Sequence, residues 1–138
     1  MHFEVERKIN ASPEKVWAIL TDATRLASGP FGILRMEGTI TEGKQIKLWS
    51  EASPKRAFPL VVKDMQKPSR MTWVGGMPLG AFTGTRTFTL VPEATSVRFH
   101  MREDYSGWLS GLIGKSIPDL NPSFAKFADA LKSAAEET

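Results

Sequence analysis

The order of hydrophobic patterns along the chain is the feature that most restricts its fold. Between Phe31 and Tyr105 the residues alternate between apolar and polar in successive short runs, a pattern typical of β-strands with one buried face. The sequence predicts strands at 32–40, 44–51, 57–66, 70–75, 83–91 and 95–105, after a first strand within residues 3–9. The breaks contain turn residues, as in Glu42-Gly43, Ser53-Pro54 and Lys67-Pro68. Such short connections favour antiparallel pairing of consecutive strands.

Helical patterns lie on both sides of this β region. In the segment INASPEKVWAILTD, Ser12 is suited to cap a helix whose first residue is Pro13. A second short helical turn is expected over residues 21–28, ended by Gly29-Pro30. Near the C-terminus, Phe124, Phe127, Ala128, Leu131 and Ala135 recur at helical spacing. They predict a long terminal helix with Asn121 as its cap and Pro122 as its first residue.

These elements predict one α+β domain spanning residues 1–138. A curved antiparallel sheet with one apolar face must cover that face, and only the terminal helix is long enough to do so. One helix does not fill the concave side of seven strands. We therefore expect a cavity between the sheet and the helix.

Composition excludes several classes of function. The chain has no cysteine, which rules out disulfides and thiolate metal sites. It has no apolar run near the roughly 20 residues that span a bilayer, so a soluble cytoplasmic protein without stable membrane insertion is expected. The formal net charge is +3 and the cationic residues are scattered, whereas nucleic-acid binding would need a denser basic stripe. We expect no metal and no cofactor, and either a monomer or a homodimer.

Arg86 is the residue that most needs an explanation. Strand alternation places it on the same face as Phe88 and Leu90. In the last strand Val97, Phe99, Met101, Glu103 and Tyr105 share one face, and Arg98, His100 and Arg102 share the solvent face. If both apolar faces point into the cavity, Phe88 pairs with Phe99 or with Met101. Either register brings Arg86 beside Glu103, directly opposite or one diagonal away.

This pair has two interpretations. Arg86 and Glu103 could form a structural ion pair near the rim of the sheet. Alternatively, they could be the polar anchor of an apolar ligand pocket, because the planar guanidinium binds carboxylate or phosphate through two hydrogen bonds.

Other candidate ligand-binding residues belong to the cavity wall and to its open end. Met71, Trp73, Phe88, Phe99 and Met101 are expected to line the wall, together with Tyr105. Met77, in the glycine-rich segment 75–80, and the segment of Trp108 and Leu112 flank the open end. Trp108 and Leu112 could simply pack on the sheet, or they could form a flexible portal for an apolar ligand.

Few residues are available for catalysis. His2 is terminal and His100 faces outward, so no histidine base is expected inside the cavity. We therefore predict no catalytic residue, although Glu103 and Tyr105 could in principle transfer protons.

Several segments together resemble the START-like (SRPBCC) superfamily, which has the helix-grip fold, in its polyketide cyclase/dehydrase and lipid transport branch. The resemblance rests on the order of INASPEKVWAILTD, Gly38-Thr39-Ile40 with Glu42-Gly43, Met71-Thr72-Trp73-Val74-Gly75, residues 84–90, Thr95-Ser96-Val97-Arg98 and residues 103–107. It covers nearly the whole chain. It implies a seven-stranded sheet that grips the C-terminal helix around an apolar ligand tunnel. This chain has Arg86 at a position where the branch often has histidine.

The expected function is the binding or transport of a small hydrophobic or amphipathic molecule in the cavity. One alternative is a polyketide cyclase- or dehydratase-like enzyme in which Arg86 holds an enolate near Glu103 and Tyr105. A second alternative is a protein-interaction module similar to the chaperone co-activators of the same fold.

Overall fold

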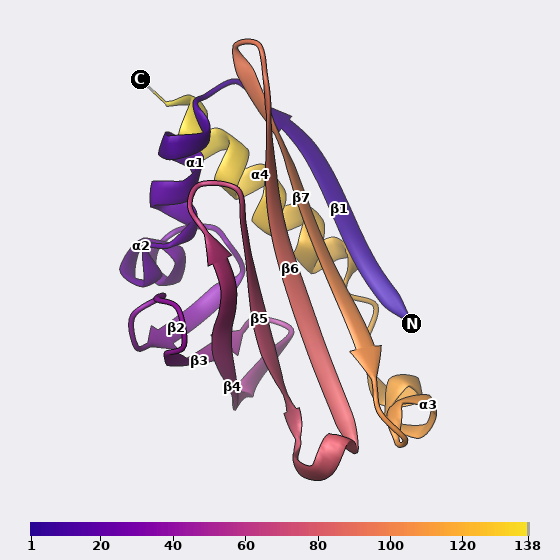
Figure 1. Cartoon of the computed structure of the whole chain (residues 1–138). Coiled ribbons are helices and arrows are strands. Elements are labelled where there is room, and N and C mark those ends of the chain that lie inside the picture. The colour runs from indigo at the N-terminus through magenta and orange to yellow at the C-terminus, as the bar shows by residue number, and fades with distance from the viewer. Residues whose placement is uncertain (138) are drawn as a thin grey trace.

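A curved sheet around one long helix dominates the structure, a computed structural model in which residues 1–137 are described (Figure 1). The strands are β1 (His2–Ile9), β2 (Ile33–Glu37), β3 (Gln45–Ser50), β4 (Ser53–Gln66), β5 (Arg70–Met77), β6 (Phe82–Glu93) and β7 (Ser96–Ser106). The helices are α1 (Pro13–Leu20), α2 (Ala23–Ser28), α3 (Ser110–Ile113) and α4 (Asn121–Glu136), with 3₁₀ turns η1 (Pro78–Gly80) and η2 (Gly114–Ser116).

The seven strands form one sheet in the order β1-β7-β6-β5-β4-β3-β2. Every neighbouring pair is antiparallel. Consecutive strands from β2 to β7 are therefore adjacent, and β1 closes the sheet beside β7. The predicted α+β helix-grip fold is confirmed, including the number of strands.

The two short helices lie between β1 and β2, as the sequence predicts. Ser12 caps α1, since its side-chain oxygen accepts a hydrogen bond from the backbone N–H of Lys15 at 3.2 Å. Asp22 caps α2 in the same way, by accepting from the N–H of Arg25 at 3.2 Å. The apolar side of α1, including Trp17, is buried in the core.

Helix α4 packs on the concave side of the sheet. Its Phe127 ring lies within 5.5–6.3 Å, centroid to centroid, of Phe31, Phe88 and Phe99. These aromatic contacts join the helix to β6, β7 and the loop before β2. Together with Leu131, which is fully buried, Phe127 fixes the helix against the sheet.

Two predicted strand limits are wrong. Ser53-Pro54 was expected to be a break, but β4 begins at Ser53 and includes Pro54. The ladder is irregular here, because Ser50 pairs with Ser53 whereas Leu48 pairs with Phe58. Proline is tolerated in such a bulge since its missing N–H breaks no ladder hydrogen bond.

The second error concerns the strand that was expected to reach residue 40. It ends at Glu37, because Gly38 adopts a φ of +99°. At this position a Cβ would lie 2.8 Å from the carbonyl oxygen of Gln45. The chain must turn there, and only glycine fits.

The predicted cap of the terminal helix is also wrong. Asn121 makes no capping hydrogen bond with its side chain, and its own N–H donates to Asp119 Oδ1 at 3.0 Å. The carboxylate two residues upstream therefore satisfies an N–H at the start of the helix. Short helix α3 was not predicted, because four residues are too few for a hydrophobic period to be visible.

None of the described helices is long and apolar enough to cross a bilayer.

Replacing Phe127 tests the packing of α4. We expect Phe127→Ala to lower the free energy of unfolding by about 3–5 kcal/mol, because it leaves a cavity among three aromatic rings. Ser133→Ala, an exposed site on the same helix, is the matched control and should change the stability by less than about 0.5 kcal/mol. Urea denaturation followed by circular dichroism measures both. Equal, small effects would contradict the packing described here.

Candidate functional site

A cavity of about 370 Å³ lies between the sheet, the first turns of α4 and the segment that leads into this helix. Its size falls within the range of small-molecule pockets. The apolar part of the wall includes Phe31, Ile33, Leu48, Phe58, Leu60, Trp73, Met101, Ile113, Phe124 and Phe127. Arg86, Glu103 and Tyr105 also line it, so that the cavity expected from the architecture contains the predicted polar residues.

The register of β6 and β7 places these polar residues together. Phe88 pairs with Met101 and Arg86 lies directly opposite Glu103, one of the two arrangements that strand alternation allows. Tyr105, two residues further along β7, faces the same side and pairs with Gly84. The predicted proximity of Arg86 and Glu103 is confirmed.

Glu103 is the centre of a hydrogen-bonded cluster. Its Oε1 accepts from Arg86 Nε at 2.8 Å, and its Oε2 accepts from the hydroxyl of Tyr105. The side chains of Arg86 and Glu103 are 21% and 15% exposed. The guanidinium carbon of Arg86 also lies 4.9 Å from the ring centroid of Phe124, within the range of a cation–π contact. Arg86 thus connects the sheet to α4.

Tyr105 is held by aromatic packing as well as by Glu103. Its ring stacks on Phe82 at 5.5 Å and meets the ring of Phe3 edge-on at 6.2 Å. Burial raises the pKa of Tyr105 well above its ordinary value, and the charge of Glu103 and the hydrogen bond to it act in the same direction. The hydroxyl therefore keeps its proton well above the pH at which a free tyrosine ionises.

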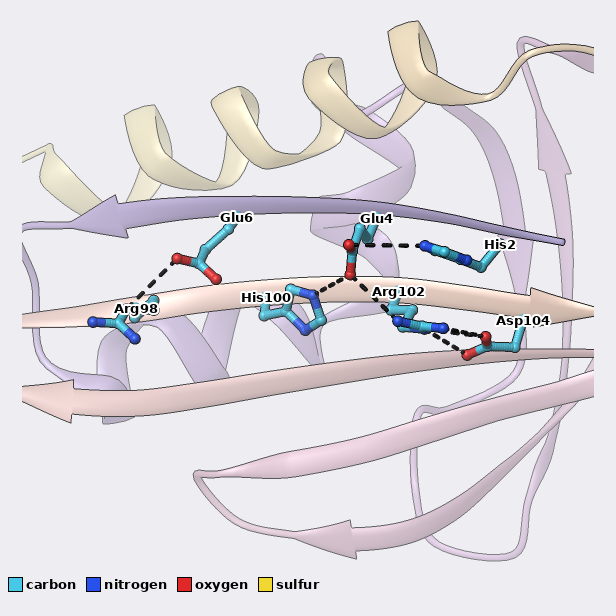
Figure 2. A network of polar contacts seen from close by, with 7 residues as sticks. All are labelled: His2, Glu4, Glu6, Arg98, His100, Arg102 and Asp104. Atoms are coloured by element: carbon cyan, nitrogen blue, oxygen red, sulfur yellow. Dashed lines mark hydrogen bonds and ion pairs between the residues drawn. The ribbon is translucent and has the colours of Figure 1, made fainter.

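Alternate residues of β1 and β7 form an ion-pair network on the outer face of the sheet (Figure 2). Glu4 lies 3.0 Å from His100 and 3.7 Å from Arg102, which binds Asp104 at 3.0 Å. The hydrogen bond from His100 is the main cause that lowers the pKa of Glu4. The predicted outward orientation of Arg98, His100 and Arg102 is confirmed, and each of them lies beside an acidic residue.

The other predicted ligand-binding residues fall into three groups. Trp73, Met77 and Met101 line the cavity. Met71, Phe88 and Phe99 are fully buried in the core and are not part of the cavity wall. Trp108 and Leu112 are 74% and 70% exposed, so the interpretation that they pack on the sheet is wrong, and neither lines the cavity.

Sequence reasoning missed part of the wall. Phe124 was assigned only to the core, although it also contacts Arg86 and the cavity. Ile117, Pro118 and Leu120 contribute from the segment before α4. That segment has no periodic pattern, and nothing in the sequence places it over the sheet.

One buried donor in the wall has no acceptor. Among the described residues, the indole Nε1 of Trp73 is the buried side-chain polar atom without a hydrogen-bond partner. Trp73 pairs with Arg86 in the β5–β6 ladder, so it is adjacent to the polar cluster. Such an atom needs an explanation, because buried donors are nearly always paired.

The part of the chain that the structure describes contains no group of three or more histidine and acidic residues able to hold a metal ion.

Comparisons with known proteins agree with this architecture. A family model described as polyketide cyclase / dehydrase and lipid transport matches residues 1–136. No match was found among curated proteins.

Solved structures share the fold at low sequence identity. The chain is similar to a hypothetical protein from Helicobacter pylori, with a TM-score of 0.78 and 14% identity over 99% of this chain and 88% of that one. A protein from Chromobacterium violaceum has a TM-score of 0.73 and 17% identity over 99% and 98% of the two chains. The Aha1 dimer from Colwellia psychrerythraea has a TM-score of 0.73 and 19% identity over 99% and 96%.

Alkaline titration tests the environment of Tyr105, the only tyrosine of the chain. In the unfolded chain its phenol should ionise near its ordinary pKa of about 10. The folded protein should keep the proton above that pH, because burial beside Glu103 opposes the phenolate. The native state then binds more protons than the unfolded state, so the free energy of unfolding should fall as the pH rises above about 10.

The phenolate absorbance band measures this directly. We expect it to appear together with alkaline unfolding in buffer, and near pH 10 in concentrated urea. Tyr105→Phe should abolish the band and reduce the alkaline loss of stability. Ionisation of the native protein at the ordinary pKa would contradict the assigned environment.

Double substitution tests the ion pair. Arg86→Leu should destabilise the protein by about 1–3 kcal/mol, because it leaves the largely buried Glu103 carboxylate without its cation. Arg86→Leu combined with Glu103→Leu should recover much of this loss. Arg98→Leu, which breaks exposed pairs on the outer face, should cost less than about 1 kcal/mol. The pair is not structural if the double variant is as unstable as the single one in thermal and urea denaturation.

Proposed function

The chain belongs to this polyketide cyclase/dehydrase and lipid transport family, and on that premise we propose that it binds a small, mainly apolar, uncharged molecule in its cavity without transforming it. The observation that carries the proposal is the cavity of about 370 Å³ in which an apolar wall surrounds the cluster of Arg86, Glu103 and Tyr105. Burial of apolar ligand surface supplies the affinity, and the cluster orients the ligand.

The charge balance of the cluster favours an uncharged ligand. The positive charge of Arg86 is already compensated by Glu103 at 2.8 Å. A ligand carboxylate would bring a second negative charge beside Glu103 in a partly desolvated site, where like charges repel strongly. An unpaired Arg86 would favour an acidic amphiphile, whereas the ion pair of Arg86 with Glu103 favours an uncharged ligand.

Hydrogen-bond donors near the cluster favour a ligand with an acceptor atom. Arg86 donates to Glu103 through Nε. Its two terminal nitrogens have no hydrogen-bond partner among the described residues, so they are available to a ligand. The Nε1 of Trp73 also lacks an acceptor, but it is fully buried, so a ligand in the cavity does not reach it. A carbonyl, ester or hydroxyl oxygen suits the terminal nitrogens of Arg86 without adding charge.

The same geometry disfavours the enzymatic alternative. Both carboxylate oxygens of Glu103 already accept hydrogen bonds, from Arg86 and from Tyr105. A substrate proton could reach Glu103 only at the remaining lone pairs of these oxygens, beside the two protein donors. The raised pKa of Tyr105 makes its hydroxyl a weak acid at neutral pH. The cluster therefore holds protons in place and is poorly arranged to transfer them.

Decanoic acid and its methyl ester are suitable probes, because they differ in charge at the head group. We expect the wild-type protein to bind the ester at least about tenfold more tightly, measured as dissociation constants by tryptophan fluorescence. Glu103→Gln frees the charge of Arg86, and it should shift this ratio toward the acid by about ten- to a hundredfold.

Asp104→Asn is the matched control, since it removes a carboxylate from the next residue but on the outer face. It should leave the ratio unchanged. Tighter binding of the acid by the wild type would contradict the uncharged ligand class. If neither probe binds and the purified protein yields no small molecule by mass spectrometry, the binding function itself is wrong.

A further inference from the structure

An exposed apolar surface lies at the end of the sheet where β5 turns into β6 and where β7 leads into α3. It consists of Met77, Leu79, Trp108 and Leu112, which we call the apolar tip. Their exposed fractions are 45%, 95%, 74% and 70%. The described chain has seven exposed large hydrophobic residues, and four of them gather here. The side chain of a fifth, Met1, lies beside Gly114, close to the same end.

The two segments of the apolar tip are joined by backbone contacts. The N–H of Leu109 donates to the carbonyl oxygen of Ala81 at 2.8 Å. Gly107 has a φ of +107°, and a Cβ there would lie 2.5 Å from the carbonyl oxygen of Gly80. The close approach thus requires glycine. Figure 1 shows the β5–β6 turn and α3 at the same end of the sheet.

The backbone of Leu79 adopts an unfavourable conformation, and its side chain does not offset this cost by packing in the core. Its φ is +62°, in the left-handed region where glycine and asparagine are favoured. Its side chain is almost completely exposed and packs in no core. An apolar environment outside the chain explains such a leucine, whereas a requirement of the turn does not.

The charges around the apolar tip indicate which environment this is. Residues 65–92 and 105–118 contain no aspartate or glutamate. Lys115, in η2 directly after α3, is exposed and has no ion pair among the described residues. The surface therefore combines apolar side chains with a free positive charge. An anionic phospholipid layer complements both, and tryptophan favours the boundary between its head groups and its acyl chains.

We infer that the apolar tip docks the protein on the surface of an anionic phospholipid bilayer, with Leu79, Trp108 and Leu112 in the interfacial layer and Lys115 among the head groups. A protein partner fits less well, because typical interfaces use about 20–30 residues a side, far more than these two turns offer. Cavity-lining Met77 and Ile113 adjoin the inserted residues, so docking brings the cavity wall next to the lipid. The docking itself does not depend on which ligand the cavity binds.

Sedimentation with vesicles tests the inference on the full chain. The probes are vesicles with equal parts of phosphatidylglycerol and phosphatidylcholine, compared with pure phosphatidylcholine. We expect the wild-type protein to bind the anionic vesicles more tightly. Leu79→Asn with Leu112→Ser should lower the partition coefficient at least about tenfold, because exposed apolar anchors are lost. Lys115→Gln should lower it about fivefold on anionic vesicles only.

Val91→Thr is the matched control, since it removes an exposed apolar residue of β6 far along the strand from the apolar tip. It should bind vesicles like the wild type, and circular dichroism should show that all variants remain folded. The inference is overturned if the wild type does not sediment with either vesicle, or if the double variant binds as well as the control. It is also overturned if sedimentation velocity shows that the apolar tip mediates dimers and no vesicle binding occurs, because the occupant is then a second copy of the chain.

Discussion

The pairing of β6 with β7 controls most of what is specific to this protein. Side chains alternate along a strand, so one register decides which residues of both strands face the helix. The observed register sets Phe88 against Met101 in the core and Arg86 against Glu103 in the cavity. A slip of one residue would place Arg86 on the outer face and turn Thr85 inward. The apolar content of the two strands excludes that slip, because it would expose Phe88.

Helix α4 has two functions that divide along its length. Its middle and C-terminal parts fill the concave side of the sheet through Phe127, Leu131 and Ala135. Its first turn supplies Phe124, which touches both the core and the guanidinium of Arg86. The cavity therefore lies where the helix begins and the sheet extends beyond it. Residues of the connecting segment 113–120 line this volume from the side opposite the sheet.

Two surfaces of the molecule differ in whether their side chains have partners within the chain. On the outer face of β1 and β7, Glu4, His100, Arg102 and Asp104 pair with one another in a single network (Figure 2). At the apolar tip, Leu79 and Trp108 are exposed without any such partner in the described chain. The charged groups of the network are already paired within the chain. The side chains of the apolar tip remain exposed to water and would be stabilised by an apolar partner. This contrast is the physical basis for assigning an interaction to the apolar tip and none to the network.

Local periodicity and strand alternation were enough to predict the fold class, the number of strands, the Ser12 cap and the neighbourhood of Arg86 and Glu103. They did not predict the limits of β2 and β4, which depend on the close approach at Gly38 and on a bulge at Pro54. The folded chain alone reveals that Tyr105 donates to Glu103, that Phe124 covers Arg86 and that Trp108 and Leu112 are exposed. These facts depend on how segments distant in sequence meet in space, and no local pattern specifies such contacts.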